Sequence, residues 1–262
     1  MNSTVLEIFR ITHADAVVAQ LPLLASPWPM TYITIAYLIF VLKAGKLFMQ
    51  ARKPYNLKNV ILGYNLFQML YNGFIFLFSA YYLFVKPVYD LRCMNTLPAE
   101  HAIKPIERFV TYAYYINKLL DFLDTVFFVL RKSYKQITFL HVYHHAVMFY
   151  AGYWIFRFYG MGGQFAMMGL LNSFVHTVMY FYYFTSAMYP HLKGNLWWKK
   201  YITRLQILQF LVLFCQALFV LVFNPSCQFP RALQCVQLAQ ATILTFMFSR
   251  FYVRAYAKPK QQ

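Results

Sequence analysis

Two long segments without a charged residue constrain the fold of this chain most strongly. They cover residues 59–85 and 205–230 and are 27 and 26 residues long. About 20 apolar residues in a helix are enough to cross the hydrocarbon core of a bilayer. A soluble core does not need such runs, so the two segments predict a membrane protein.

The composition points the same way, because only 12% of the residues are charged, about half the ordinary share of a soluble domain. We expect an all-α polytopic membrane protein, with residues 1–262 forming a single transmembrane domain. The N-terminal segment lacks the continuous apolar core of a cleaved signal peptide, so the first span should direct the chain to the membrane. Seven spans are predicted, at residues 28–49, 59–85, 107–130, 137–156, 164–189, 205–224 and 231–251.

Basic residues are distributed unevenly between the two predicted faces of the membrane. With a lumenal N-terminus, fifteen lie on the cytosolic side, namely Lys46, Arg52, Lys53, Lys58, Arg131, Lys132, Lys135, Lys193, Lys199, Lys200, Arg204, Arg250, Arg254, Lys258 and Lys260. Seven lie on the lumenal side, namely Arg10, Lys86, Arg92, Lys104, Arg108, Arg157 and Arg231. The positive-inside rule therefore predicts a lumenal N-terminus and a cytosolic C-terminus.

The net charge of +17 has two interpretations. It can follow from topology and attraction to anionic lipid in the bilayer, or the cytosolic loops can in addition receive a polyanionic substrate. Nucleic acid is not an expected partner, because the basic residues are scattered over short loops and do not form one soluble face.

The four cysteines do not form a metal-binding pattern. Cys93 and Cys227 fall in the two longer lumenal loops, where oxidising conditions would allow a disulfide. Cys215 and Cys235 lie inside predicted spans and are expected in the core. Asn2 begins a formal glycosylation motif on the lumenal side, although its place at the terminus disfavours use.

Charged residues are concentrated in the third predicted span. Lys118, Asp121 and Thr125 are spaced i, i+3 and i+7 and share one helix face, with Asp124 nearby. Charges at this depth are costly and usually functional. The alternative is a purely structural ion pair that faces the helix bundle.

Histidines dominate the fourth and fifth predicted spans. His141, His144 and His145 are spaced i, i+3 and i+4 and point into one sector, while Asn172 and His176 are one turn apart. The asparagine could hold the His176 imidazole in one tautomer. The sixth span adds Thr203, Gln206, Gln209 and Gln216, which favour interhelical hydrogen bonds.

Three chemistries could use such an interior. A di-iron oxygenase needs more ligands than four membrane histidines and two aspartates provide, so no metal is expected. A proton-coupled transporter could use the same residues as a relay. Three histidines on one turn instead favour general-base and nucleophilic catalysis by imidazole on an acyl thioester.

Five sequence segments carry a family resemblance. In order and spacing, the chain resembles the very-long-chain fatty acid elongases, the membrane condensing enzymes of the endoplasmic reticulum, over about residues 52–256. The segments are "RKPYNLKNVILGYN", "KLLDFLDTVFFVLRK", "FLHVYHH", "NSFVHTVMYFYYF" and "TRLQILQF". The family usually has glutamate where this chain has Asp121, which is shorter by one methylene.

The resemblance implies seven transmembrane helices, six of them in a ring around an acyl tunnel. It implies condensation of a long-chain acyl-CoA with malonyl-CoA to give a 3-ketoacyl-CoA, CO2 and CoA, without a further cofactor. His144 is the implied acyl acceptor, in a water-excluded site where an acyl-imidazole can survive. The implied catalytic set is His141, His144, His145, His176, Asn172, Asp121 and Asp124.

Further partners follow from charge, position and the C-terminal sequence. The C-terminal "AKPKQQ" resembles a dilysine retrieval signal of the endoplasmic reticulum, which requires a cytosolic C-terminus. A homodimer and association with other enzymes of the elongation cycle are both left open. The candidates for binding the CoA phosphates at the cytosolic mouth are Lys118, Arg131, Lys132, Lys199, Lys200, Arg204 and Arg254.

Overall fold

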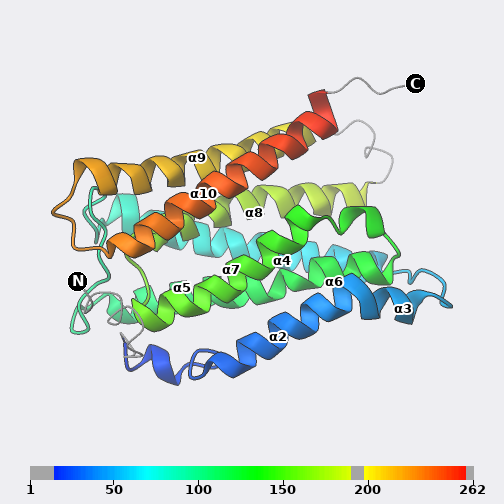
Figure 1. Cartoon of the computed structure of the whole chain (residues 1–262), viewed down its shortest axis with the longest axis horizontal. Coiled ribbons are helices and arrows are strands. Elements are labelled where there is room, and N and C mark those ends of the chain that lie inside the picture. The colour runs from blue at the N-terminus through cyan, green and yellow to red at the C-terminus, as the bar shows by residue number, and fades with distance from the viewer. Residues whose placement is uncertain (1–14, 190–197, 258–262) are drawn as a thin grey trace. The chain divides into compact units, whose positions relative to one another are not determined.

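The computed structural model describes residues 15–189 and 198–257, and these residues form helices and loops without a strand (Figure 1). The all-α prediction is confirmed. Asn2, Lys193, Lys258 and Lys260 lie outside the described residues, and so does most of the dilysine-like segment. The α-helices are α2 (Pro27–Ile39), α3 (Gly45–Met49), α4 (Lys58–Ala80), α5 (Lys104–Leu120), α6 (Phe122–Leu130), α7 (Phe139–Phe158), α8 (Phe165–Met188), α9 (Lys199–Phe223) and α10 (Arg231–Tyr252).

Shorter helical pieces extend several of these helices. Three turns are π-helical: η2 (Phe40–Ala44) joins α2 to α3, η3 (Tyr81–Val85) lengthens α4, and η6 (Val253–Ala257) follows α10. Two 3-10 turns, η1 (Val18–Gln20) and η4 (Tyr134–Gln136), precede α2 and α7. Each segment predicted as a span is therefore helical for most of its length.

Helix α9 begins before the predicted start of the sixth span. The sixth span was expected to start at residue 205, whereas α9 begins at Lys199. The prediction stopped at the last basic residue, Arg204, because it followed the apolar run. The helix continues past the apolar run, since the long side chains of lysine and arginine are good helix formers.

Four helical segments are long and apolar enough to cross a membrane, namely Pro27–Met49, Lys58–Val85, Lys199–Phe223 and Arg231–Tyr256. The protein is therefore a membrane protein. The other three predicted spans coincide with α5 and α6, α7, and α8, which carry the candidate catalytic residues. Polar side chains lower the hydropathy of these helices, and the count of seven spans stays a prediction.

The chain divides into two compact units. The first contains Met1–Asn56 and Thr96–Gly162, with α2, α3, α5, α6 and α7. The second contains Leu57–Asn95 and Gly163–Gln262, with α4, α8, α9 and α10.

Aromatic side chains form the core of the first unit. The rings of Tyr37 and Phe122 stack with centroids 3.9 Å apart, and Phe149 lies 5.3 Å from Phe122 and 5.0 Å from Tyr115. Gly152 lets Tyr115 approach α7, because an added Cβ would lie 3.3 Å from its ring. This packing fixes α2, α6 and α7 against one another.

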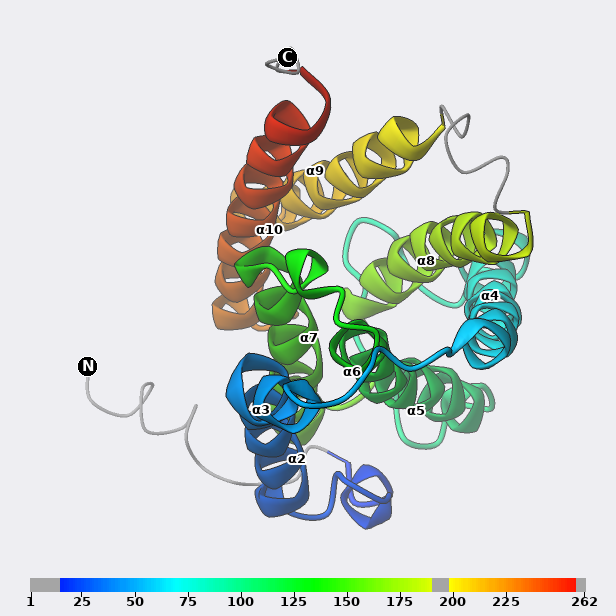
Figure 2. The same cartoon turned by 90° about the vertical axis from the view of Figure 1, so that its right-hand side faces the viewer.

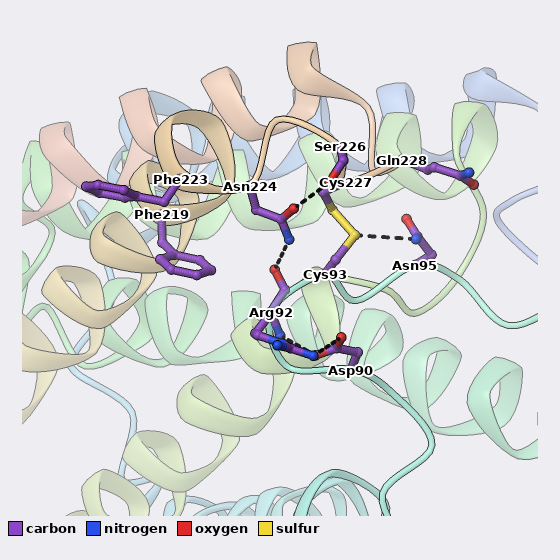
Figure 3. Close-up of a pocket in the computed structure, with 10 residues that line it drawn as sticks. All are labelled: Asp90, Arg92, Cys93, Asn95, Phe219, Phe223, Asn224, Ser226, Cys227 and Gln228. Atoms are coloured by element: carbon purple, nitrogen blue, oxygen red, sulfur yellow. Dashed lines mark hydrogen bonds and ion pairs between the residues drawn. A yellow bond between two sulfur atoms is a disulfide. The ribbon is translucent and has the colours of Figure 1, made fainter.

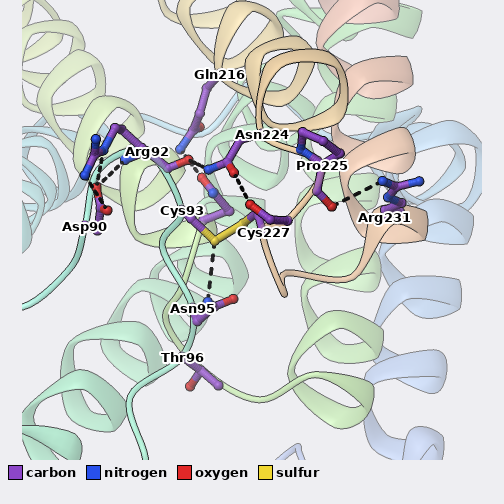
Figure 4. Close-up of a disulfide and its surroundings, with 12 residues drawn as sticks. Asp90, Arg92, Cys93, Asn95, Thr96, Gln216, Asn224, Pro225, Cys227 and Arg231 are labelled. Carbon is purple, nitrogen blue, oxygen red and sulfur yellow. Dashed lines mark hydrogen bonds and ion pairs between the residues drawn. A yellow bond between two sulfur atoms is a disulfide. The ribbon is translucent and has the colours of Figure 1, made fainter.

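In the second unit, α4 packs beside α8 and α9 beside α10 (Figure 2). Cys93, in the loop after α4, is joined by a disulfide to Cys227, in the loop between α9 and α10, with their Cα atoms 5.5 Å apart (Figure 4). The expectation that Cys215 and Cys235 are core residues was wrong, because both are exposed on their helices. In a membrane helix an apolar side chain can face lipid, so hydrophobicity does not predict burial.

Helix α4 shows the same inverted pattern between Asn65 and Leu77, apart from the buried Ile75. Its amide side chains Asn65, Gln68 and Asn72 are buried. Its large apolar side chains Phe67, Leu70, Phe74 and Leu77 are exposed. A helix with polar groups inside and apolar groups outside is suited to lipid surroundings, where no water can satisfy the polar groups.

Candidate active site

Three histidines lie together at the start of α7. The hydroxyl of Thr138 accepts a hydrogen bond of 3.2 Å from the backbone N–H of His141 and caps the helix. The ring centroids of His141 and His145 are 4.3 Å apart, and those of His144 and His145 are 5.7 Å apart. His145 is buried, and the other two are half-buried. The first two turns of α7 therefore carry one imidazole cluster.

A buried ion pair lies in the same unit, at the junction of α5 and α6. Lys118 Nζ is 2.8 Å from Asp121 Oδ2, and the two side chains are 2% and 4% exposed. The shorter aspartate thus still reaches the lysine. The ammonium group of Lys118 also lies 4.9 Å from the centroid of the Tyr114 ring. The ammonium group of Lys118 neutralises the Asp121 carboxylate, which is buried away from water that would solvate its charge.

Thr125 connects α6 to the histidine cluster. Its Oγ1 lies 2.8 Å from His141 Nε2 and 2.8 Å from the hydroxyl of Tyr37 on α2. Thr125 is fully buried and Tyr37 is 6% exposed. The charges of Lys118 and Asp121 also act on His144. The ion pair, the threonine and the histidines therefore form one polar site inside the first unit.

Asp124 lies on α6 between the ion pair and Thr125. It is half-buried, and its charge acts on Tyr37. Asp121 therefore acts on the histidine cluster, whereas Asp124 acts on Tyr37.

Asn172 and His176 belong to the second unit, on the buried face of α8. Asn172 is 2% exposed, and His176 is 5% exposed. The ring of His176 lies 5.8 Å from that of Tyr180, whose hydroxyl is 3.3 Å from the hydroxyl of Tyr64 on α4. Gln68 donates a hydrogen bond of 3.1 Å to Tyr64. His176 thus borders a buried network of hydroxyl and amide groups between α4 and α8.

Three buried amide side chains of α4 and the hydroxyl of Tyr37 were not among the residues predicted from the sequence. Asn65, Gln68 and Asn72 are spaced i, i+3 and i+7 in a segment without charge, and this period predicts a polar helix face. That signal was present and was not used. Tyr37 has no comparable signal, because a single tyrosine in an apolar span is common.

Glutamines link three segments of the second unit. Gln216 donates to Gln164 over 2.7 Å, and Gln237 donates to Gln216 over 3.1 Å and to the carbonyl of Leu213 over 3.2 Å. The interpretation of Gln216 as an interhelical hydrogen-bonding residue is therefore supported. Thr203 and Gln209 are buried, and Gln206 donates to Met179 Sδ over 3.9 Å.

The basic candidates for phosphate binding fall into three places. Arg131 is exposed at the end of α6, and the neighbouring Lys132 donates to the carbonyl of Gln50 over 3.4 Å. Lys199, Lys200 and Arg204 begin α9, and Arg254 follows α10. Lys118 differs from all of these, because it is buried against Asp121.

Aromatic rings hold the basic end of the second unit together. The guanidinium of Arg204 lies 5.2 Å and 5.3 Å from the ring centroids of Tyr201 and Tyr252, and its Nε donates to the Tyr252 hydroxyl over 2.8 Å. In sequence, the one carboxylate of this unit is Asp90, in the disulfide-bonded loop. The cations at the start of α9 are thus available to an anionic ligand.

A cavity of about 460 Å³ lies beside the disulfide at the opposite end of α9 (Figure 3). Hydrogen bonds from Arg92 hold the pKa of Asp90 below its ordinary value, and Asn224 donates to the carbonyl of Arg92 over 3.1 Å. No candidate catalytic residue lines this cavity. Its lining consists of Asp90, Arg92, Cys93, Asn95, Phe219, Phe223, Asn224, Ser226, Cys227 and Gln228.

Within residues 15–189 and 198–257, no three His, Cys, Asp or Glu side chains are arranged to hold a metal ion. The metal-free reaction stays a prediction.

Comparisons with known proteins identify the family. The sequence profile of the GNS1/SUR4 family matches residues 22–262. Very long chain fatty acid elongase F of Drosophila melanogaster is 40% identical over 240 residues, which cover 92% of this chain and 93% of the relative. Very long chain fatty acid elongase 4 of Homo sapiens is 37% identical over 265 residues, which cover 100% of this chain and 82% of the relative. The chain therefore belongs to the GNS1/SUR4 family of very-long-chain fatty acid elongases.

Proposed function

We propose that this protein is the condensing enzyme of fatty acid elongation, a 3-ketoacyl-CoA synthase that joins a long-chain acyl-CoA with malonyl-CoA. The observation that carries the proposal is the cluster of His141, His144 and His145 beside the buried Lys118–Asp121 pair. Imidazole is a nucleophile and a base, and the ion pair supplies fixed charges near it. The relatives named as elongases support this chemistry over transport or oxygenation.

In the first half-reaction, a neutral imidazole nitrogen of His144 attacks the thioester carbon. The carbon–sulfur bond breaks, the CoA thiolate takes the proton of the other ring nitrogen and leaves as the thiol, and the acyl group stays on His144 as a neutral acyl-imidazole. The half-buried position of His144 among apolar side chains of α7 limits access of water. Exclusion of water is the condition under which an acyl-imidazole persists long enough to react.

In the second half-reaction, malonyl-CoA loses CO2, and the electron pair of the broken bond forms a carbanion. The carbanion attacks the acyl carbon, the bond to His144 breaks, the departing imidazole takes up one proton from solvent, and 3-ketoacyl-CoA is released. Decarboxylation drives this step, so the site needs no strong base. The ammonium group of Lys118 is the nearby cation that favours developing negative charge, and Asp121 holds it in place.

The CoA phosphates are assigned to exposed or half-buried basic residues before α7, at the start of α9 and after α10. His144 is six residues after the cap Thr138, about 9 Å along the helix axis. Arg131 and Lys132 precede this cap, and Lys199, Lys200, Arg204 and Arg254 cluster in the second unit. We exclude Lys118 from this role because it is buried.

His176 and Asn172 are proposed to serve the same reaction from the second unit. Their burial beside the Tyr180 and Tyr64 hydroxyls is typical of functional residues inside a membrane. Replacement of His176 by alanine should reduce the turnover number strongly, whereas replacement of the exposed Tyr183 on the same helix by phenylalanine should not.

The proposed setting is the membrane of the endoplasmic reticulum, with seven spans around an acyl tunnel. The lumenal N-terminus and cytosolic C-terminus follow from the distribution of basic residues. Tags at the two ends in selectively permeabilised cells test this topology. Equal accessibility of both tags would refute an odd number of spans.

Condensation by the purified full-length protein tests the proposed function. The protein in lipid nanodiscs should convert labelled malonyl-CoA and one member of a panel of acyl-CoAs into 3-ketoacyl-CoA, identified by mass spectrometry. His144→Ala should abolish the product. His101→Ala is the matched control, because His101 lies in an exposed loop outside the cluster. The activity should persist when a chelator removes divalent metal ions. Absence of product with every acyl-CoA would overturn the proposal.

A further inference from the structure

A chain of two hydrogen bonds ties α2 to the histidine cluster. The Tyr37 hydroxyl lies 2.8 Å from Thr125 Oγ1, which lies 2.8 Å from His141 Nε2. We propose that Tyr37 is a positioning residue, which acts through Thr125 to hold His141 in one tautomer and one orientation. This inference rests on the proposed function, since the histidine cluster is its catalytic centre.

The position of the Tyr37 hydroxyl is fixed by packing. The Tyr37 ring stacks on Phe122 with centroids 3.9 Å apart and an interplanar angle of 12°. Phe122 in turn packs on Phe149 of α7. Both atoms of the Tyr37–Thr125 bond are buried. A hydroxyl held in this way cannot turn to water, so its hydrogen must be shared inside the protein.

The direction of the two hydrogen bonds follows from the donors that are present. Each hydroxyl has one hydrogen to donate and can accept further bonds. A phenol is more acidic than an aliphatic alcohol, so it is the better donor of the two. We infer that Tyr37 donates to Thr125 and that Thr125 donates to His141 Nε2, across distances of 2.8 Å that fit either direction. That arrangement leaves Nε2 as the acceptor and places the proton of a neutral His141 on Nδ1.

The orientation of the His141 ring also affects the other two histidines of the cluster. The backbone of His141 is held by Thr138, and its ring is held at Nε2 by Thr125. Its centroid lies 4.3 Å from that of His145, which neighbours His144. A flipped or rotated His141 would change which of its nitrogens offers a proton to the cluster. Tyr37 thereby influences the reaction without contact with a substrate.

A double-mutant cycle tests this relay, the pair of hydrogen bonds from Tyr37 through Thr125 to His141. Tyr37→Phe and Thr125→Val each remove a hydroxyl and keep the shape of the side chain, so each should lower kcat about 10-fold with KM little changed. The double variant should be no slower than Thr125→Val, because Tyr37 acts only through Thr125. Thr125→Ser restores the hydroxyl and should restore most of the activity.

The matched control is Tyr32→Phe, on the same helix but with Tyr32 64% exposed, which should leave kcat unchanged. Multiplied losses, about 100-fold in the double variant, would mean that Tyr37 and Thr125 act independently and would overturn the proposal. Equal rates for Tyr37→Phe and the control would overturn it as well.

Nitrogen NMR of histidine-labelled protein gives a readout that does not depend on the reaction. Wild-type His141 should show an unprotonated Nε2 and a protonated Nδ1, and Tyr37→Phe should give a mixture of tautomers. A protonated Nε2 in the neutral wild-type ring, or an unchanged spectrum in Tyr37→Phe, would refute the relay. If wild-type protein forms no 3-ketoacyl-CoA while these spectra appear as expected, the proposed function fails and the relay stands.

Discussion

Replacing Asp121 by asparagine would leave the Lys118 ammonium group in the protein interior without its neutralising carboxylate. The two side chains are only 4% and 2% exposed, and they are 2.8 Å apart. Removal of one member of a buried ion pair costs about 3–5 kcal/mol, because the remaining charge stays desolvated. We therefore expect Asp121→Asn to lower the free energy of unfolding by about that amount.

The double variant Lys118→Met with Asp121→Leu separates the cost of an uncompensated charge from the worth of the pair. Replacing both charges by apolar groups is often nearly neutral, so this variant should be clearly more stable than Asp121→Asn. It should nevertheless be inactive, because the charges near His144 are lost.

The assay is reversible unfolding in mixed detergent micelles, followed by tryptophan fluorescence. Asp90→Asn is the control, because its ion pair with Arg92 is exposed, with side chains 55% and 78% accessible. Surface pairs contribute little, and no measurable change is expected there. The reasoning would be refuted if the double variant were as unstable as Asp121→Asn, or if Asp121→Asn matched the control.

Three further predictions concern the parts of the chain outside the histidine cluster. Gly162→Ala should destabilise the first unit by about 1–3 kcal/mol, since Gly162 has φ +92° and an added Cβ would collide with the Glu107 side chain; thermal unfolding measures it. Burial raises the pKa of Asp15, but hydrogen bonds from Arg108 and the backbone lower it by more, so its net shift is downward. A carboxyl whose pKa is lower in the folded than in the unfolded protein stabilises the fold at pH values above its unfolded pKa. The difference in free energy of unfolding between wild type and Asp15→Asn should therefore be constant above about pH 5 and shrink as the pH falls below about 4. Unfolding measured over a pH series would contradict this if the difference grew at low pH. Cys93→Ser should cost about 2–4 kcal/mol by releasing a loop closed over 134 residues, and a reducing agent should lower wild-type stability to the same level.

The helices could be predicted because apolar runs and polar faces have a local period. The grouping of His141, His144 and His145 followed from their spacing on a single helix, and so did the pairing of Lys118 with Asp121. In each case the partners lie within four residues, where helix geometry decides contact.

Apart from the Cys93–Cys227 disulfide, contacts between distant segments could not be predicted in this way. Tyr37 and Thr125 are 88 residues apart, and no local pattern links them. The burial of Cys215 and Cys235 was predicted wrongly for a related reason. Lipid accepts apolar side chains on the outside, so only polar periods such as Asn65, Gln68 and Asn72 indicate the inner face.

The most direct test of the account is whether His144 carries the acyl group between the two half-reactions. Purified wild-type protein incubated with acyl-CoA alone should release one CoA per molecule and gain one acyl mass in intact mass spectrometry. His144→Ala should do neither. If CoA appears only when malonyl-CoA is also present, and no acylated protein can be trapped, the carbanion attacks the bound thioester directly and His144 acts as a base or an orienting group.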